Sequence, residues 1–499
     1  MSDPTEAAPV FDFDNSYARL PERFYSRTLP TKVASPRLIR LNKDLARHLK
    51  LDTELLASPK GVEILAGNRI ASGSDPLAMA YAGHQFGNFV PQLGDGRAIL
   101  LGEVTGRDGE RRDIQLKGSG PTPFSRRGDG RAALGPVLRE YILSEAFFAL
   151  GIPTTRALAA VTTGEFVYRD PPAPGAVLTR VAASHIRAGT FQYFAARGDA
   201  EAIQLLADHI IARHYPQAAL VPNRYLALLE QVIARQAALI SQWMHVGFIH
   251  GVMNTDNMSI AGETIDFGPC AFIDAYHPGT VFSSIDQMGR YAYANQPRIA
   301  QWNLTRLAET LLPLLAEDKE TALALAQGAI NGFGGCYEAA YAGGFARKLG
   351  LLQPRPDGDV ALGLDLLEKM AANEADFTLT FRGLCDAAWS ADGLAATGRL
   401  FKDASAFDDW AIRWRQRLDS EGGDARARRE MMRAANPAFI ARNHLVEEVI
   451  AAAVNGNDFA PFEALLKVLA RPFEDQPGHE RFSQPPTPSQ VVYQTFCGT

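Results

Sequence analysis

Cysteine is scarce in this sequence: the 499 residues include four, and no two of them form a C-x-x-C pair. This scarcity disfavours a zinc site and a disulfide-framework domain, and it predicts a reducing, cytoplasmic setting. No run of about 18 or more apolar residues occurs, so we expect no membrane-spanning helix. Neither sign of charge dominates, because the formal net charge is only −6. This net charge does not indicate binding to nucleic acid or to an anionic membrane.

The remaining composition is that of an ordinary globular protein, with 46% hydrophobic and 21% charged residues. The length allows roughly two to four domains. The opening residues, MSDPTEAAPVFDFD, are acidic and polar, unlike a secretory signal or an Arg-rich transit peptide. We expect a monomer without nucleic-acid or membrane partners.

The stretch HGVMNTDNMSIAGETIDFG, from His250 to Gly268, contains both halves of a nucleotide–metal site. Asn257 follows the His by seven residues, and a DFG triplet begins nine residues later at Asp266. This spacing is typical of the catalytic loop and DFG triplet of protein kinases. An amide oxygen and a carboxylate suit Mg²⁺ held against phosphates, so Asn257 and Asp266 are the predicted metal ligands.

The catalytic base of a kinase is missing from this stretch. Val252 stands two residues after the His, where a kinase has its catalytic Asp. The nearest carboxylate is Asp256, immediately before the Asn. The sequence therefore predicts an intact metal half and a base displaced to Asp256.

A β-rich region precedes this stretch. Ala98–Val104 and Ile114–Lys117 are expected strands, joined by a turn at Asp108-Gly109. The Gly94-Asp95-Gly96-Arg97 segment before them could bring backbone amides close to phosphate, although most such matches are plain turns. Lys117 ends the second strand, where a kinase places its phosphate-binding Lys; a solvated surface Lys is the alternative.

The next segment, GSGPTPFSRRGDGRAALG, places Arg126, Arg127 and Arg131 around Gly128-Asp129-Gly130. Such a flexible basic loop suits contact with a polyanion, and the alternative is a solvated charged turn. A helix is expected from Gly135 to Leu150.

That helix carries two candidate partners for Lys117. Glu140, in its first turns, takes the place of the kinase Glu that holds the Lys on the phosphates. Glu145 is the second candidate, and for either residue the alternative is a surface carboxylate.

Two more expected strands, Ala157–Thr162 and Ala176–Val181, complete a small lobe. Arg180 and Arg187 fall at its exit, where a kinase hinge normally faces an adenine. Two cations at this place indicate that the phosphates of the nucleotide bind at a position that is unusual for a kinase. The alternative is that both arginines form surface salt bridges.

The chain after about residue 200 is predicted to be helical, up to a polar, Pro-rich tail from Pro472. The expected helices are Ala202–His214, Tyr225–Val246, Asn303–Leu325, Gly332–Leu351, Asp365–Leu379, Asp408–Leu418 and Leu445–Leu469. Of the first 90 residues, only Leu41–Leu51 shows a clear helical pattern. The Gly-rich stretch Gly83–Gly87 is interpreted as a loop packed on a domain.

Four segments together carry a specific resemblance: GHQFGNFVPQLGDGR, LKGSGPTPFSRRGDGRA, LGIPTTRAL and HGVMNTDNMS. With the near-terminal Cys497, they make the chain similar to the selenoprotein O (SelO/YdiU-type) family, densely from about residue 83 to 300. The resemblance implies a protein-kinase-like fold, ATP bound in a flipped orientation, and transfer of AMP to Ser, Thr or Tyr hydroxyls of proteins.

The resemblance also implies roles for individual residues. Asp256 would act as base, Asn257 and Asp266 would hold Mg²⁺ or Mn²⁺, and Glu140 would pair with Lys117. The nucleotide would be bound by Gly94, Gly96, Arg97, Lys117, Asp129, Gly130, Glu140, Arg180, Arg187 and Asp266. Cys497 corresponds to the family's terminal Cys or selenocysteine, and a disulfide between it and Cys270 is one possibility; free thiols are the other.

We therefore predict a bilobal, kinase-like α+β fold with N- and C-terminal extensions. Its expected parts are an extension (1–90), a β-rich N-lobe (91–185), a helical C-lobe (186–470) and a tail (471–499). The predicted function is Mg²⁺- and ATP-dependent protein adenylylation. The alternatives are a kinase that moves the γ-phosphoryl group and an inactive nucleotide-binding scaffold.

Overall fold

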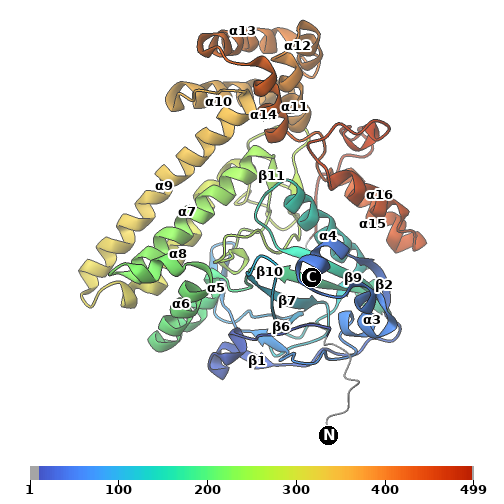
Figure 1. Cartoon of the computed structure of the whole chain (residues 1–499), viewed down its shortest axis with the longest axis vertical. Coiled ribbons are helices and arrows are strands. Elements are labelled where there is room, and N and C mark those ends of the chain that lie inside the picture. The colour runs from blue at the N-terminus through green and yellow to red at the C-terminus, as the bar shows by residue number, and fades with distance from the viewer. Residues whose placement is uncertain (1–9, 497–499) are drawn as a thin grey trace.

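The computed structural model describes residues 10–496, except for the side chains of Pro356 and Asp357. A β-rich N-terminal region packs against a larger helical region (Figure 1). This arrangement confirms the predicted bilobal, kinase-like α+β fold. The boundaries at residues 90, 185 and 470 remain predictions.

An antiparallel eight-stranded sheet forms the N-terminal region, with strands in the order β1-β3-β6-β7-β10-β9-β2 and β8 paired with β10. Its strands are β1 (Tyr25–Arg27), β2 (Arg37–Leu41), β3 (Leu77–Met79), β6 (Ala98–Thr105), β7 (Arg111–Lys117), β8 (Ala132–Ala133), β9 (Arg156–Val167) and β10 (Ala173–Ala182). Two small sheets pair β4 (Gly83–Gln85) with β5 (Asn88–Val90) and β11 (Phe248–Ile249) with β12 (Ala271–Phe272).

The turn chemistry of the sequence explains the central hairpin. Gly109 has φ of 80°, a left-handed conformation that glycine adopts without a steric penalty, and it lets β6 return directly into β7. The predicted strands at 98–104 and 114–117 are confirmed, as are those at 157–162 and 176–181.

The first 90 residues contribute more than the sequence indicated. Strands β1, β2 and β3 all join the main sheet, at or near its edges. Helices α1 (Lys43–His48), α2 (Thr53–Ala57) and α3 (Pro59–Leu65) share a hydrophobic core with strands β6, β7, β9 and β10. The Gly83–Gly87 stretch forms strand β4 and the turn that leads into β5, so its interpretation as a loop was wrong.

The remaining chain is mainly helical. Its helices are α4 (Leu134–Ala149), α5 (Ala188–Ala195), α6 (Ala200–His214), α7 (Arg224–His245), α8 (Gln296–Leu315), α9 (Lys319–Leu349), α10 (Pro356–Asn373), α11 (Phe377–Ala387), α12 (Ala391–Gly398), α13 (Ala404–Glu421), α14 (Ala425–Ala435), α15 (Asn443–Gly456) and α16 (Ala460–Leu469).

Helix α4 joins the two regions. It packs on β9 and β10 on one side and on α15 and α16 on the other (Figure 1). Its Phe147 ring lies 4.4 Å from that of Phe248 in β11 and 5.1 Å from that of Phe267 in the DFG triplet, between ring centroids. The helix is therefore fixed relative to the segment that carries Asp266.

Three expected helices are broken, two where a polar cap begins a new helix and one where a left-handed residue ends a helix. Asn303–Leu325 is interrupted because the Asp318 side chain accepts a hydrogen bond from the backbone of Thr321 and so starts α9. Asp365–Leu379 is interrupted before Asp376, which caps α11. Leu445–Leu469 is interrupted at Asn457, whose φ of 49° ends α15.

Helices α12 and α14 were not expected from the sequence. Within residues 10–496, no helix is long and apolar enough to cross a membrane.

Candidate nucleotide site

A cavity of about 420 Å³ opens between the sheet and the helical region. Eleven of the predicted site residues line it: Gly94, Gly96, Arg97, Lys117, Asp129, Gly130, Arg180, Arg187, Asp256, Asn257 and Asp266. Glu140 instead lines a neighbouring cavity of about 200 Å³ and reaches the first one through its contact with Lys117. The tertiary structure thus gathers residues that lie up to 172 positions apart in the sequence, from 94 to 266.

Lys117 links strand β7 to helix α4 and to the DFG triplet. Its Nζ forms ion pairs with Glu140 Oε2 and, at 3.0 Å, with Asp266 Oδ1. Glu145, the second candidate partner, instead binds Arg156 at 2.7 Å. Glu140 is therefore the helical carboxylate that holds Lys117.

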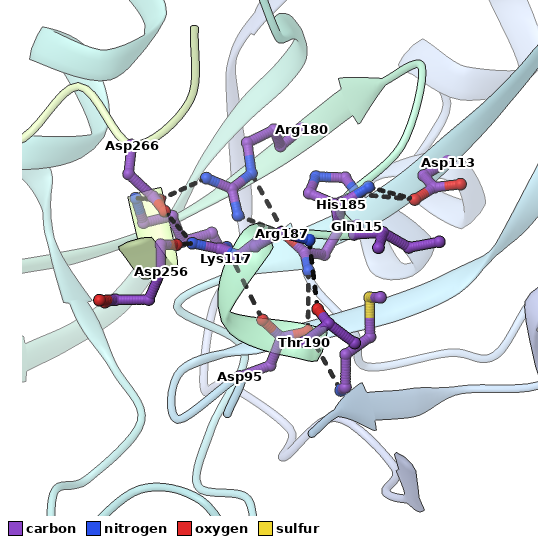
Figure 2. A network of polar contacts seen from close by, with 12 residues as sticks. Asp95, Asp113, Gln115, Lys117, Arg180, His185, Arg187, Thr190, Asp256 and Asp266 are labelled. Atoms are coloured by element: carbon purple, nitrogen blue, oxygen red, sulfur yellow. Dashed lines mark hydrogen bonds and ion pairs between the residues drawn. The ribbon is translucent and has the colours of Figure 1, made fainter. Parts of the chain in front are cut away.

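Arg180 and Arg187 point at the same carboxylate, as Figure 2 shows. Arg180 Nη1 lies 2.6 Å from Asp266 Oδ1, and Arg187 Nη1 lies 2.5 Å from Asp266 Oδ2. Their side chains are 1% and 3% exposed. The alternative of surface salt bridges is therefore wrong for both arginines.

These cations determine the charge of Asp266. Burial favours the neutral acid, but Arg187, Lys117 and Arg180 outweigh it and hold the pKa of Asp266 well below its ordinary value. The backbone of Asp266 is left-handed, with φ of 61°, which is uncommon for a residue other than glycine. Backbone strain of this kind gathers at functional sites.

Asp256 lies in a different electrostatic environment. It is 7% exposed, and burial raises its pKa to about 6, against the lowering effect of Arg187. Its Oδ2 accepts a hydrogen bond from Gln85 Nε2, 3.3 Å away, and its Oδ1 is buried without a partner among the described residues. A carboxylate with a pKa near 6 is well suited to accept a proton at neutral pH.

The rest of the catalytic loop is held by hydrogen bonds. His250 Nε2 lies 2.9 Å from the carbonyl oxygen of Ile265, just before the DFG triplet. Asn257 Nδ2 donates to the carbonyl oxygen of Val252 at 2.8 Å, which leaves its amide oxygen available as a ligand. Val252 lines the cavity with an apolar side chain.

The donor set fits a divalent cation brought in by a nucleotide. In residues 10–496, no group of three or more His, Cys, Asp or Glu side chains could hold a metal by itself. One carboxylate and one amide oxygen, completed by phosphate oxygens, are typical of Mg²⁺ sites in nucleotide-binding enzymes. Asn257 and Asp266 would supply those two oxygens.

Hydrogen bonds anchor the basic loop at Thr122 and at Asp129. Thr122 Oγ1 donates to the carbonyl oxygen of Asp95 at 2.7 Å, and Asp129 accepts two hydrogen bonds from Arg169 at 2.8 and 3.0 Å. Gly94 has φ of 72°, and a Cβ there would lie 2.2 Å from the ring of Phe124. Only glycine permits this close approach, and the flexibility expected of the loop stays a prediction.

Sequence reasoning missed the cavity-lining residues of the β4–β5 region. Tyr81, Gln85 and Phe86 line the cavity, and the ring of Tyr81 lies under the Arg187 guanidinium at 4.7 Å. The available signal was the GHQFG segment, which carries polar and aromatic side chains between glycines.

The cysteine prediction remains untested. Cys270 is buried next to the DFG triplet, while Cys497 lies outside the described residues. The described tail ends against the same region, because Thr495 Oγ1 donates to the carbonyl oxygen of Pro269 at 2.5 Å.

Comparisons with known proteins agree with this geometry. The family model described as "Protein adenylyltransferase SelO" matches residues 9–470. The chain is 68% identical over 496 residues to a protein named protein nucleotidyltransferase YdiU from Methylorubrum extorquens (strain PA1), covering 98% of this chain and 99% of the relative. It is 64% identical over 490 residues to the protein of the same name from Bradyrhizobium diazoefficiens, with the same coverage.

Proposed function

The chain belongs to the protein adenylyltransferase SelO family, and we propose that its cavity transfers AMP from ATP to a Ser, Thr or Tyr hydroxyl of a protein. The family makes it a nucleotidyltransferase with ATP as its substrate. The observation that carries the proposed mechanism is the convergence of Lys117, Arg180 and Arg187 on one carboxylate, that of Asp266.

The buried position of these cations orients the nucleotide. Arg180 and Arg187 contact the carboxylate of Asp266 next to Lys117, and the side chains of both arginines are almost fully buried. Guanidinium groups bind phosphate oxygens strongly in such an environment. The β- and γ-phosphates therefore point inward, and the α-phosphorus faces the side of the cavity that carries Asp256.

The reaction forms one bond and breaks one. The acceptor hydroxyl oxygen attacks the α-phosphorus, the bond from that phosphorus to the α–β bridging oxygen breaks, and pyrophosphate leaves with the electron pair. Asp256 accepts the hydroxyl proton. Lys117, Arg180 and Arg187 stabilise the negative charge that develops on the leaving group.

Asn257 and Asp266 would hold Mg²⁺ or Mn²⁺. The bound cation would neutralise charge on the phosphate oxygens. Both oxygens of Asp266 contact Lys117, Arg180 or Arg187, so these cations would have to exchange Asp266 for phosphate oxygens before Asp266 could hold a cation.

Isotopic labelling decides between this reaction and γ-phosphoryl transfer. The protein is incubated with Mg²⁺ or Mn²⁺, dephosphorylated casein, and ATP labelled at either the α- or the γ-phosphate. Label from the α-phosphate should enter the enzyme or casein, with a mass gain equal to AMP on Ser, Thr or Tyr. Incorporation of the γ label alone would make the protein a kinase.

The role of Asp256 has its own test. Asp256→Asn removes the proton acceptor at nearly constant size, and loss of a general base typically lowers a rate by about 10²- to 10⁴-fold. Full activity of this variant would show that the base lies elsewhere or is not needed.

A further inference from the structure

The β4–β5 hairpin lies directly against the catalytic loop, although 171 residues separate Gln85 from Asp256. The backbone N–H of His84 donates to Thr255 Oγ1 at 2.7 Å, and that of Phe86 donates to Asn254 Oδ1 at 3.1 Å. Two consecutive loop residues are therefore held from the same strand and its turn. A hairpin fastened in this way can position the residue that follows, Asp256.

Gly83 determines where the Asp256 carboxylate can lie. A Cβ on Gly83 would lie 2.4 Å from Asp256 Oδ1, so only glycine allows the carboxylate its observed place. Oδ1 is packed into this space and is buried without a hydrogen-bond partner among the described residues. Because Asp256 also lines the cavity, Oδ2 is the oxygen left for a substrate to reach.

Gln85 makes the hydrogen bond that orients this second oxygen. Its Nε2 donates to Asp256 Oδ2 at 3.3 Å, and its side chain lines the same cavity. A carboxylate oxygen has two lone pairs. When Gln85 takes one of them, the other remains for the proton of an acceptor hydroxyl.

We propose that Gln85 is a positioning residue for adenylyl transfer, holding Asp256 against Gly83 so that Oδ2 faces the acceptor hydroxyl. This proposal rests on the proposed function of Asp256 as the proton acceptor. Gln85 acts through Asp256 and takes no proton itself. Its loss affects the chemical step and leaves ATP binding, which depends on Lys117, Arg180 and Arg187, intact.

The first experiment replaces the amide at nearly constant shape. In Gln85→Met, kcat for incorporation of α-labelled AMP into dephosphorylated casein should fall by about 10- to 100-fold, because a hydrogen bond to a charged group is lost. The Kd for ATP with Mg²⁺, measured by titration calorimetry, should change by less than about twofold. A wild-type kcat, or an equal loss of kcat and of ATP affinity, would overturn the proposal.

The matched control is Asn88→Ala. Asn88 pairs with Gln85 across the hairpin but is exposed and does not line the cavity. Its loss should leave both kcat and ATP affinity unchanged.

Gln85→Glu is a second, isosteric variant whose carboxylate repels that of Asp256 instead of donating a hydrogen bond to it. It should lower kcat at least as much as Gln85→Met does. If Gln85→Met does not fold, the kcat of Gln85→Glu tests the proposal in its place. A wild-type kcat in Gln85→Glu would overturn the proposal.

A double-mutant cycle separates this proposal from the function it rests on. If Gln85 acts through Asp256, adding Gln85→Met to Asp256→Asn should lower kcat no further. A further loss equal to that of Gln85→Met alone would refute the positioning role. Full activity of Asp256→Asn by itself would instead refute Asp256 as the base, whatever Gln85 does.

Discussion

Two clusters of buried charged side chains lie near each other, and only one of them lines the nucleotide cavity. Figure 2 shows Lys117, Arg180, Arg187 and Asp266 of the first cluster and Asp113 and His185 of the second. The cavity cluster consists of Lys117, Glu140, Arg180, Arg187 and Asp266. The closed cluster consists of Glu103, Asp113, His185 and Arg213. In the closed cluster, Arg213 contacts Asp113 at 2.6 Å and Glu103 at 3.2 Å, and His185 Nδ1 lies 3.0 Å from Asp113.

Burial and perturbed ionisation are common to both clusters, so neither property identifies a binding site. Burial opposes the charge of Asp113, but Arg213 and His185 lower its pKa, much as three cations lower that of Asp266. The clusters differ in their balance of charge. Seven lysine or arginine residues and four aspartates line the cavity, whereas Arg111 and Arg213 face the two carboxylates of the closed cluster. A net positive charge next to a cavity is what a polyphosphate requires.

The largest expected effect comes from removing the centre of the cavity cluster. Asp266→Asn should lower AMP incorporation by roughly 10³-fold, because it removes both a metal ligand and the group around which the cations are arranged. The measurement is the initial rate with α-labelled ATP. A rate within about tenfold of wild type would contradict the assignment of Asp266.

In the closed cluster the equivalent change should affect stability instead. Asp113→Ala leaves the buried Arg213 with fewer partners and should lower the free energy of unfolding by about 3–5 kcal/mol, while kcat per folded molecule stays the same. Urea unfolding at neutral pH measures the loss. Asp44→Ala is the control, because its ion pair with Arg47 is exposed and contributes about 0–1 kcal/mol.

Lys117 tests whether a cation in the cavity cluster binds nucleotide. Lys117→Met should raise the KM for ATP by roughly 10- to 100-fold, because a charged hydrogen bond to phosphate is lost. The melting temperature should change little, since Arg180 still neutralises Glu140 and Asp266. An unaltered rate at subsaturating ATP would remove Lys117 from the site.

The smallest effect concerns pH and the closed cluster. Burial lowers the pKa of His185 to about 4. Between about pH 6.5 and about pH 4, the unfolded chain binds a proton at this histidine and the folded protein does not. The free energy of unfolding therefore falls as the pH falls. Between about pH 7.5 and about pH 5 the loss due to His185 should be up to about 2 kcal/mol.

Urea unfolding of wild type and His185→Gln at both pH values measures this contribution. The wild type should lose more stability on acidification than the variant does. Equal losses in the two proteins would contradict a buried, neutral His185.

Local sequence was enough to predict much of the site. Lys117 ends a strand whose turn, Asp108-Gly109, is visible in the sequence, and Asn257 and Asp266 are separated by a fixed and short stretch of chain. Helix breaks were harder to predict, because the apolar pattern continues across Asp318 and Asp376 and only the capping side chains reveal the new helix.

The amino-acid sequence by itself determined which chemical groups are present and which of them are close along the chain: the candidate base Asp256, the Asn257–Asp266 pair and the glycine segment at Gly94. Only the tertiary structure decided which of two glutamates holds Lys117, that Arg180 and Arg187 are buried, and that Gln85 meets Asp256. The physical reason is distance along the chain. Hydrogen bonds between residues 149 or 171 positions apart depend on how the sheet, helix α4 and the catalytic loop pack together, and no local pattern records that packing.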